Sequence, residues 1–203
     1  MKKFILDKCM KIIKDNKNYN ETKLAEIKYG LEGIYLMFTK LIVIGTIALI
    51  LGIFKELILF LIIYNIIRMP SFGLHATKSW ICLVSSTLAF IGIPLIINNL
   101  ELNSTIKLII GILSTLHISI YSPADTHKKP IVNKKRRKLY KLLSTIISII
   151  YIALSIIVNN QYISNCFLFS TLLQNILISP ITYKIFKLPY NNYKTYMLKH
   201  GLN

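Results

Sequence analysis

Six runs of apolar residues, each separated from the next by a short polar stretch, dominate this sequence. A helix needs about 18 or more apolar residues to cross the hydrocarbon core of a bilayer, and several of the runs meet that length. Of the 203 residues, 54% are apolar, which leaves little sequence for a soluble domain. The pattern therefore predicts an all-α, polytopic membrane helical bundle of about six transmembrane helices. The expected spans are residues 33–54, 57–69, 80–97, 106–121, 142–158 and 162–186, and 57–69 is short for a full crossing.

The whole chain, residues 1–203, is expected to form a single membrane domain. Residues 1–31 alternate Lys with apolar residues at helical spacing, which is typical of an amphipathic helix lying in the interface plane. We expect this segment at the cytoplasmic face, followed by a transmembrane bundle over residues 33–186. A basic cytoplasmic loop is expected at 122–141, and a polar, Tyr-rich cytoplasmic tail at 187–203.

Positive charge is distributed unevenly along the chain, whose formal net charge is +17. If the N-terminus lies inside and the chain crosses six times, all of the 25 Lys and Arg residues except Lys55 and Lys107 lie on the cytoplasmic side. This arrangement satisfies the positive-inside rule. Because the charge lies beside apolar spans, it favours anionic lipid headgroups and acidic peptides as partners. Nucleic acid is not an expected partner, since no basic platform with interleaved aromatic residues is present.

The three cysteines are Cys9, Cys82 and Cys166. An odd number without a C-x-x-C spacing indicates neither a disulfide framework nor a zinc site, and no metal or other cofactor is expected. Cys9 and Cys166 lie in apolar stretches and are expected to be inert. Cys82 is different, because it closely follows His75 at a polar break between two expected spans.

A His near a Cys is the minimal arrangement for thiol catalysis, in which the imidazole takes the thiol proton and later protonates the leaving amine. In one continuous helix, residues seven apart lie about 10.5 Å apart along the axis, too far for a hydrogen bond. Cooperation of His75 with Cys82 therefore requires a turn, and Pro70 and Gly73 supply breaks. Cys82 would then lie in the first turn of the next helix, where the helix N-terminus favours a thiolate.

Three ordered motifs give the chain a resemblance to the accessory gene regulator protein B (AgrB) family. The first is the tract from Lys28 to Glu32, and the second is Gly73-Leu-His75-Ala followed by Cys82. The third runs from Tyr121 through Lys128-Lys129 to Ile131, with the basic run 133–138 after it. Length, hydropathy profile and motif order match the family over nearly the whole chain.

The resemblance implies a membrane cysteine endopeptidase of a Gram-positive bacterium that processes a quorum-sensing propeptide. Such an enzyme removes the acidic C-terminal part of a short peptide, keeps the new C-terminus as an acyl-enzyme thioester, and promotes cyclisation to a thiolactone or lactone. By this resemblance Cys82 is the nucleophile and His75 the base, at the cytoplasmic face. Lys128 and Lys129 match a lysine pair that the family uses in processing, and a homodimer is a further expectation.

Other polar residues and other functions stay open. We include Lys78 and Glu32 with Lys128 and Lys129 as candidate substrate-binding residues, although a solvated or ion-paired role is the simpler explanation of Glu32. Asp125 is open in the same way. The first alternative function is a non-enzymatic peptide exporter or transporter subunit, which predicts polar side chains along a path through the spans. The second is a structural or lipid-binding membrane protein that uses the basic segment.

Overall fold

The computed structural model describes residues 2–16, 19–74, 79–126 and 130–201. Regular structure in these ranges is helical, apart from isolated bridges such as the parallel one between Phe72 and Ala124. The prediction of an all-α fold is therefore confirmed. The chain divides into two compact units, Met1–Ile50 and Leu51–Asn203, which are described separately.

The first unit holds two helices, α1 (Lys2–Asn16) and α2 (Glu21–Ile50), which contact each other. Leu6 and Met10, one turn apart on α1, are buried. α2 has 30 residues and is therefore about 45 Å long, longer than a bilayer core is thick. It joins the second part of the expected amphipathic segment to the first expected span without a break, so residue 31 is not a helix boundary.

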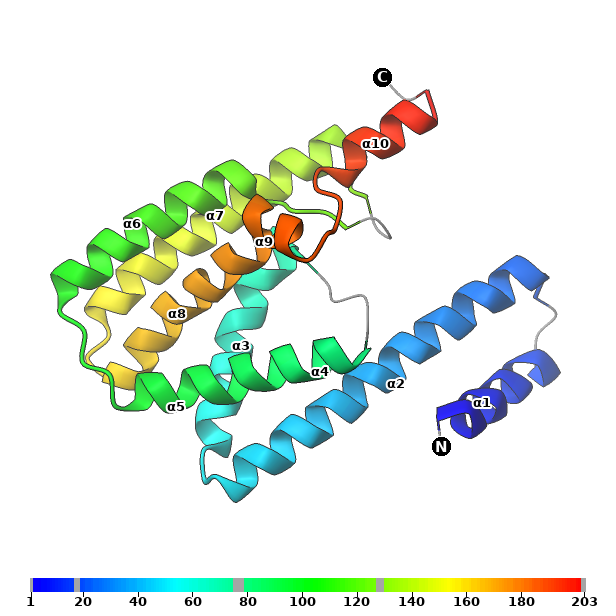
Figure 1. Cartoon of the computed structure of the whole chain (residues 1–203), viewed down its shortest axis with the longest axis horizontal. Coiled ribbons are helices and arrows are strands. Elements are labelled where there is room, and N and C mark those ends of the chain that lie inside the picture. The colour runs from blue at the N-terminus through cyan, green and yellow to red at the C-terminus, as the bar shows by residue number, and fades with distance from the viewer. Residues whose placement is uncertain (1, 17–18, 75–78, 127–129, 202–203) are drawn as a thin grey trace. The chain divides into compact units, whose positions relative to one another are not determined.

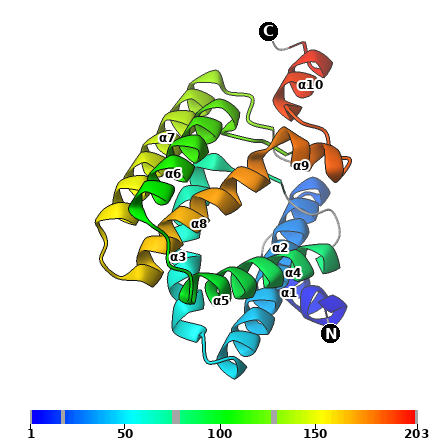
Figure 2. The same cartoon turned by 60° about the vertical axis from the view of Figure 1, so that its left-hand side comes forward.

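The second unit contains the remaining helices (Figures 1 and 2). After α3 (Phe54–Ser71), the helix α4 (Ser79–Thr87) continues through a π-helical turn, η1 (Leu88–Gly92), into α5 (Ile93–Asn98). Three helices then lie side by side: α6 (Ser104–Tyr121), α7 (Lys134–Ile157) and α8 (Gln161–Ile178). Two short helices, α9 (Pro180–Ile185) and α10 (Asn192–Lys199), end the chain.

Asparagine caps fix where these three long helices begin. The side chains of Asn103, Asn133 and Asn160 accept hydrogen bonds from backbone N–H groups in the first turns of α6, α7 and α8, which satisfies donors that a helix N-terminus leaves unpaired. Because Asn133 caps α7, the basic residues from Lys134 onward are helical. The expected loop at 122–141 is correspondingly shorter in the structure.

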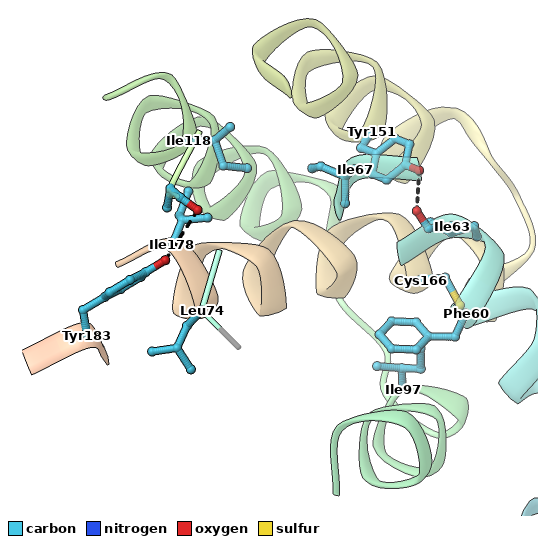
Figure 3. Close-up of a cluster of buried hydrophobic side chains, with 11 residues drawn as sticks. Phe60, Ile63, Ile67, Leu74, Ile97, Ile118, Tyr151, Cys166, Ile178 and Tyr183 are labelled. Carbon is cyan, nitrogen blue, oxygen red and sulfur yellow. Dashed lines mark hydrogen bonds between the residues drawn. The ribbon is translucent and has the colours of Figure 1, made fainter. Parts of the chain in front are cut away.

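Helix α8 is the centre of the second unit and packs against α3, α5, α6 and α7. Figure 3 shows the apolar cluster around it, in which the Tyr151 hydroxyl also donates to the Ile63 carbonyl at 2.6 Å. The cluster comprises Phe60, Ile63, Ile67, Leu74, Ile97, Ile118, Ala124, Tyr151, Cys166, Ile178 and Tyr183. It joins residues from every long helix of the unit, and it includes Leu74, which directly precedes His75 in the sequence.

Small and hydroxyl-bearing residues form the contact between α6 and α7. Gly111 lies against Ile152, and hydroxyl pairs join Thr115 to Ser148 at 2.7 Å and Ser122 to Ser144 at 2.6 Å. Close approach over small residues, with hydroxyl hydrogen bonds between helices, is the usual packing of helices in a membrane.

Four stretches of the described chain are long and apolar enough to cross a membrane: α2, the continuous α4–η1–α5, α6 and α7. They identify the chain as a helical membrane protein. α3 and α8 have 18 residues each, about 27 Å of helix, but α3 carries the charged residues Lys55, Glu56 and Arg68, and α8 carries several amide and hydroxyl side chains. Six crossings would require both of them to span, and that number stays a prediction.

Candidate active site

The chain leaves helix α3 just before the predicted catalytic His75. The break expected from Pro70 and Gly73 is present, but it begins only at Phe72, because Pro70 still lies inside α3. We call residues 71–74 the strap. Within it Phe72 has φ 56° and Gly73 has φ 119°, so the backbone turns sharply away from the helix axis. Only glycine adopts a φ like that of Gly73 without strain.

An arginine one turn earlier secures the strap. The guanidinium of Arg68 donates hydrogen bonds to the carbonyl oxygens of Phe72, of Gly73 at 3.3 Å and of Leu74 at 3.0 Å. These carbonyls follow the end of α3, where backbone acceptors lack helical partners, and the planar fork of an arginine suits several acceptors at once. Arg68 therefore fixes the last three residues before His75.

Backbone hydrogen bonds hold the strap from two further sides. The Gly73 N–H donates to the Ala124 carbonyl at 2.8 Å, and the Ala124 N–H donates to the Ser71 carbonyl at 3.1 Å. The Leu74 N–H donates to the Leu177 carbonyl of α8 at 2.9 Å. The Gln174 side-chain amide also donates to the Phe72 carbonyl at 2.7 Å. The residues leading to His75 are thus bound to α3, to α8 and to the segment after α6.

Cys82 lies in the first described turn of α4 and is partly buried. No residue of α4, Ser79–Thr87, is fully buried within the described structure, so this helix offers its side chains to a ligand or to lipid. His75 and Lys78 lie outside the described residues, and their distance from Cys82 stays a prediction.

The predicted lysine pair, Lys128 and Lys129, also lies outside the described residues. The residues on either side are described: the Ile131 N–H donates to the Asp125 carboxylate at 3.3 Å. The following basic run forms the first turns of α7, where the exposed cations are Lys134, Lys135, Arg136 and Lys138. These four side chains form a cationic surface available to an acidic peptide or to anionic lipid.

Asp125 is buried and ion-paired, which was one of its two expected roles. Its carboxylate lies 3.6 Å from the Arg137 guanidinium and accepts a hydrogen bond from the Tyr193 N–H at 2.8 Å. The Arg137 guanidinium stacks over the Tyr193 ring, 3.5 Å from its centroid. One carboxylate therefore joins the segment after α6, the start of α7 and the start of α10.

The segment between α8 and α10 packs on the same region. The Tyr183 hydroxyl and the Asn192 side-chain amide each donate to the Asp125 carbonyl at 3.2 Å. The Tyr190 hydroxyl donates to the Tyr121 carbonyl at 3.5 Å. Burial raises the pKa of Tyr190 to about 12, so this hydroxyl stays protonated and remains a donor. The expected tail at 187–203 is thus partly bound to the bundle.

Two further polar residues, Glu32 and His117, are described. Glu32 is partly buried on α2, in the first unit, and its proposed relation to substrate stays a prediction. His117, on α6, is held by the Asn175 side chain at 3.1 Å between Nδ1 and Oδ1. Among the described residues, no three His, Cys, Asp or Glu side chains gather as a metal site would require.

Sequence reasoning missed how Arg68, Ala124 and Asp125 act together. The sequence marks Arg68 only as a positive charge near the break, and Ala124 only as a small residue within the third motif. Their partners are carbonyl and N–H groups, which no side-chain pattern reveals. A signal for Asp125 did exist, since an acidic residue between a span and a strongly basic run has cations within reach.

Comparison with known proteins gives a consistent result. The family model described as Accessory gene regulator B matches residues 6–178. An AgrB-like protein of Listeria monocytogenes is 31% identical over 185 residues, 91% of each chain. The accessory gene regulator protein B of Staphylococcus aureus is 34% identical over 140 residues, 68% of this chain and 74% of that protein. An AgrB-like protein of Clostridium acetobutylicum is 31% identical over 84% of this chain and 82% of its own. No solved structure matches.

Proposed function

This chain belongs to the accessory gene regulator B family of membrane proteins, and from that premise we propose that it is a cysteine endopeptidase acting on a quorum-sensing propeptide. Its place would be the cell membrane of a Gram-positive bacterium, with the active site at the cytoplasmic face. The observation that supports this most is the fixed strap, which ends one residue before His75, together with Cys82 in the first described turn of the next helix.

The proposed reaction uses Cys82 and His75 in turn. His75 takes the Cys82 proton, the thiolate attacks the scissile carbonyl, and the C–N bond breaks as the imidazolium protonates the leaving amine. The peptide remains on Cys82 as a thioester. A Cys thiol or Ser hydroxyl within the same peptide then attacks that carbonyl, which closes a thiolactone or lactone ring and restores the Cys82 thiol.

Charge supports a short substrate with an acidic C-terminal segment. The proposed contacts for that segment are Lys78, Lys128 and Lys129, and the exposed cations at the start of α7 add to the positive potential. Glu32, as an acidic residue, is proposed to bind another part of the substrate. The same cations suit anionic headgroups, so membrane lipid is a second proposed partner. Cyclisation requires that water be kept from the thioester, which a membrane-surface site favours. A homodimer is proposed from the family alone.

The test uses the purified protein in liposomes with the peptide encoded beside its gene. Wild type, Cys82→Ser and His75→Ala are compared by mass spectrometry for cleavage and for a covalent peptide adduct. Cys9→Ser is the matched control, because it makes the same atom change on α1. We expect the first two variants to lose at least about 100-fold in cleavage rate and the control to keep wild-type activity. Wild-type cleavage by both Cys82→Ser and His75→Ala would show the assignment to be wrong.

A further inference from the structure

The Asp125 carboxylate has more partners than a surface ion pair needs. It is 2% exposed, pairs with Arg137 at 3.6 Å, and accepts from the backbone N–H groups of Ile131 at 3.3 Å and Tyr193 at 2.8 Å. Asp125 precedes the Lys128–Lys129 pair in the sequence and Ile131 follows it. The carboxylate therefore joins the two ends of the lysine segment to each other and to α10.

The neighbouring residue connects Asp125 to the strap. Ala124 is buried and pairs through both of its backbone groups, as donor to the Ser71 carbonyl and as acceptor from the Gly73 N–H. One peptide bond separates this pairing from Asp125, whose own carbonyl is held by Tyr183 and Asn192. Displacement of Asp125 would move Ala124, and with it the strap that precedes His75.

From this arrangement we propose that Asp125 is a positioning residue for the proposed peptidase reaction, holding the strap before His75 in a fixed relation to Ile131 and to the start of α7. The inference rests on the proposed function for its catalytic consequence. Its structural part, the dependence of the strap on Asp125, can be measured without substrate. A carboxylate suits the task because it accepts several N–H groups at once and its charge is balanced by Arg137.

A second buried charged group offers a matched control. Lys107 is 4% exposed and donates to the Ser164 hydroxyl at 2.6 Å, joining α6 to α8 near the opposite end of α6 from Asp125. Their side-chain hydrogen bonds join them to each other and Ser164 to the Ser155 carbonyl, and none of these reaches the strap. Ser164→Ala therefore weakens a buried charged contact in the same bundle while leaving the neighbourhood of Asp125 unchanged.

The first measurement is amide hydrogen exchange in detergent or nanodiscs, with fragmentation that resolves single residues. In Asp125→Ala we expect the Gly73 amide, whose acceptor is Ala124, to exchange at least tenfold faster than in wild type. The Leu74 amide, whose acceptor is Leu177 on α8, should change less. In Ser164→Ala both strap amides should exchange as in wild type after correction for any change in global stability.

The second measurement is the rate of peptide adduct formation on Cys82 in liposomes, expressed per folded protein. We expect Asp125→Ala to slow it at least tenfold, Asp125→Asn to slow it less, and Ser164→Ala to stay within twofold of wild type. Arg137→Gln alone leaves the Asp125 charge buried without its cation and should slow adduct formation. The double variant Asp125→Asn/Arg137→Gln, which removes both charges, should form the adduct faster than Arg137→Gln alone. That recovery would reflect removal of a buried charge without a partner.

Unchanged exchange at Gly73 in Asp125→Ala would overturn the inference, whatever the enzyme does. So would an adduct rate no lower than that of Ser164→Ala. If Asp125→Ala does not fold, Asp125→Asn is judged by the same two comparisons. A wild-type protein that forms no adduct on Cys82 would instead contradict the proposed function and with it the catalytic consequence, while the exchange data would still decide whether Asp125 holds the strap.

Discussion

Gly73→Ala should be among the most damaging single substitutions in the second unit. Its φ of 119° lies where residues with a Cβ are strained, at a cost of about 1–3 kcal/mol. The new Cβ would also lie 2.8 Å from the Leu177 carbonyl oxygen and would meet the Arg68 guanidinium, and such overpacking costs about 1–3 kcal/mol. Together these effects lower the free energy of unfolding by roughly 2–6 kcal/mol.

The matched control is Gly92→Ala, which makes the same change in η1. A Cβ there meets nothing within 4 Å, and alanine is up to about 1 kcal/mol better than glycine within a helix. Circular dichroism during heat- or SDS-induced unfolding in mild detergent would compare the two variants. We expect Gly92→Ala to be neutral or stabilising and Gly73→Ala to unfold much earlier. If the two variants differ by less than about 0.5 kcal/mol, the reasoning about the strap is refuted.

Two further predictions concern other contacts of the bundle. Arg68→Lys keeps the charge but loses the planar guanidinium that binds the strap carbonyls, so we expect about 1–3 kcal/mol of destabilisation and slower peptide cleavage. Unfolding in detergent measures the first effect and mass spectrometry the second. A variant that is as stable and as active as wild type would contradict the role of Arg68. Gly111→Ala places a Cβ 2.7 Å from the Ile152 side chain and should cost about 1–3 kcal/mol. In the background of Ile152→Ala, which removes all three contacting carbons (Cγ1, Cγ2 and Cδ1), the added cost of Gly111→Ala should largely disappear, and an equal cost in both backgrounds would count against this contact.

The sequence predicts where the helices lie better than what their polar residues do. Apolar runs mark α6 and the continuous α4–η1–α5 within one or two residues, because helix length in a membrane follows hydropathy. Helix α8 was expected as an ordinary span, yet its fully buried side chains include Asn165 and Gln174. Which face of a helix meets protein and which meets lipid depends on its neighbours, and a single hydropathy profile does not contain them.

In the candidate site, too, some features can be predicted from the sequence and others are seen only in the folded chain. The proximity of His75 and Cys82 along the chain, and the break before them, follow from local sequence. The restraint on that break does not, because Ala124 and Leu177 lie more than 50 residues away from Gly73 in the sequence and act through backbone groups. Such partners become visible only when the chain is folded.

The polar groups inside the bundle bear on the exporter alternative. That function predicts polar side chains along a path through the spans, and the sequence offers few obvious candidates: His117, Asn65 and Gln174. In the structure the Gln174 amide donates to the Phe72 carbonyl, His117 is bound to Asn175, and the Asn65 amide donates to the Leu61 carbonyl of its own helix at 2.7 Å. Since breaking a buried hydrogen bond costs about 1–3 kcal/mol, Gln174 is suited to holding the strap and His117 to joining α6 with α8. Peptide movement through the second unit would have to rearrange these contacts, whereas cleavage at a strap-supported site requires that they stay in place.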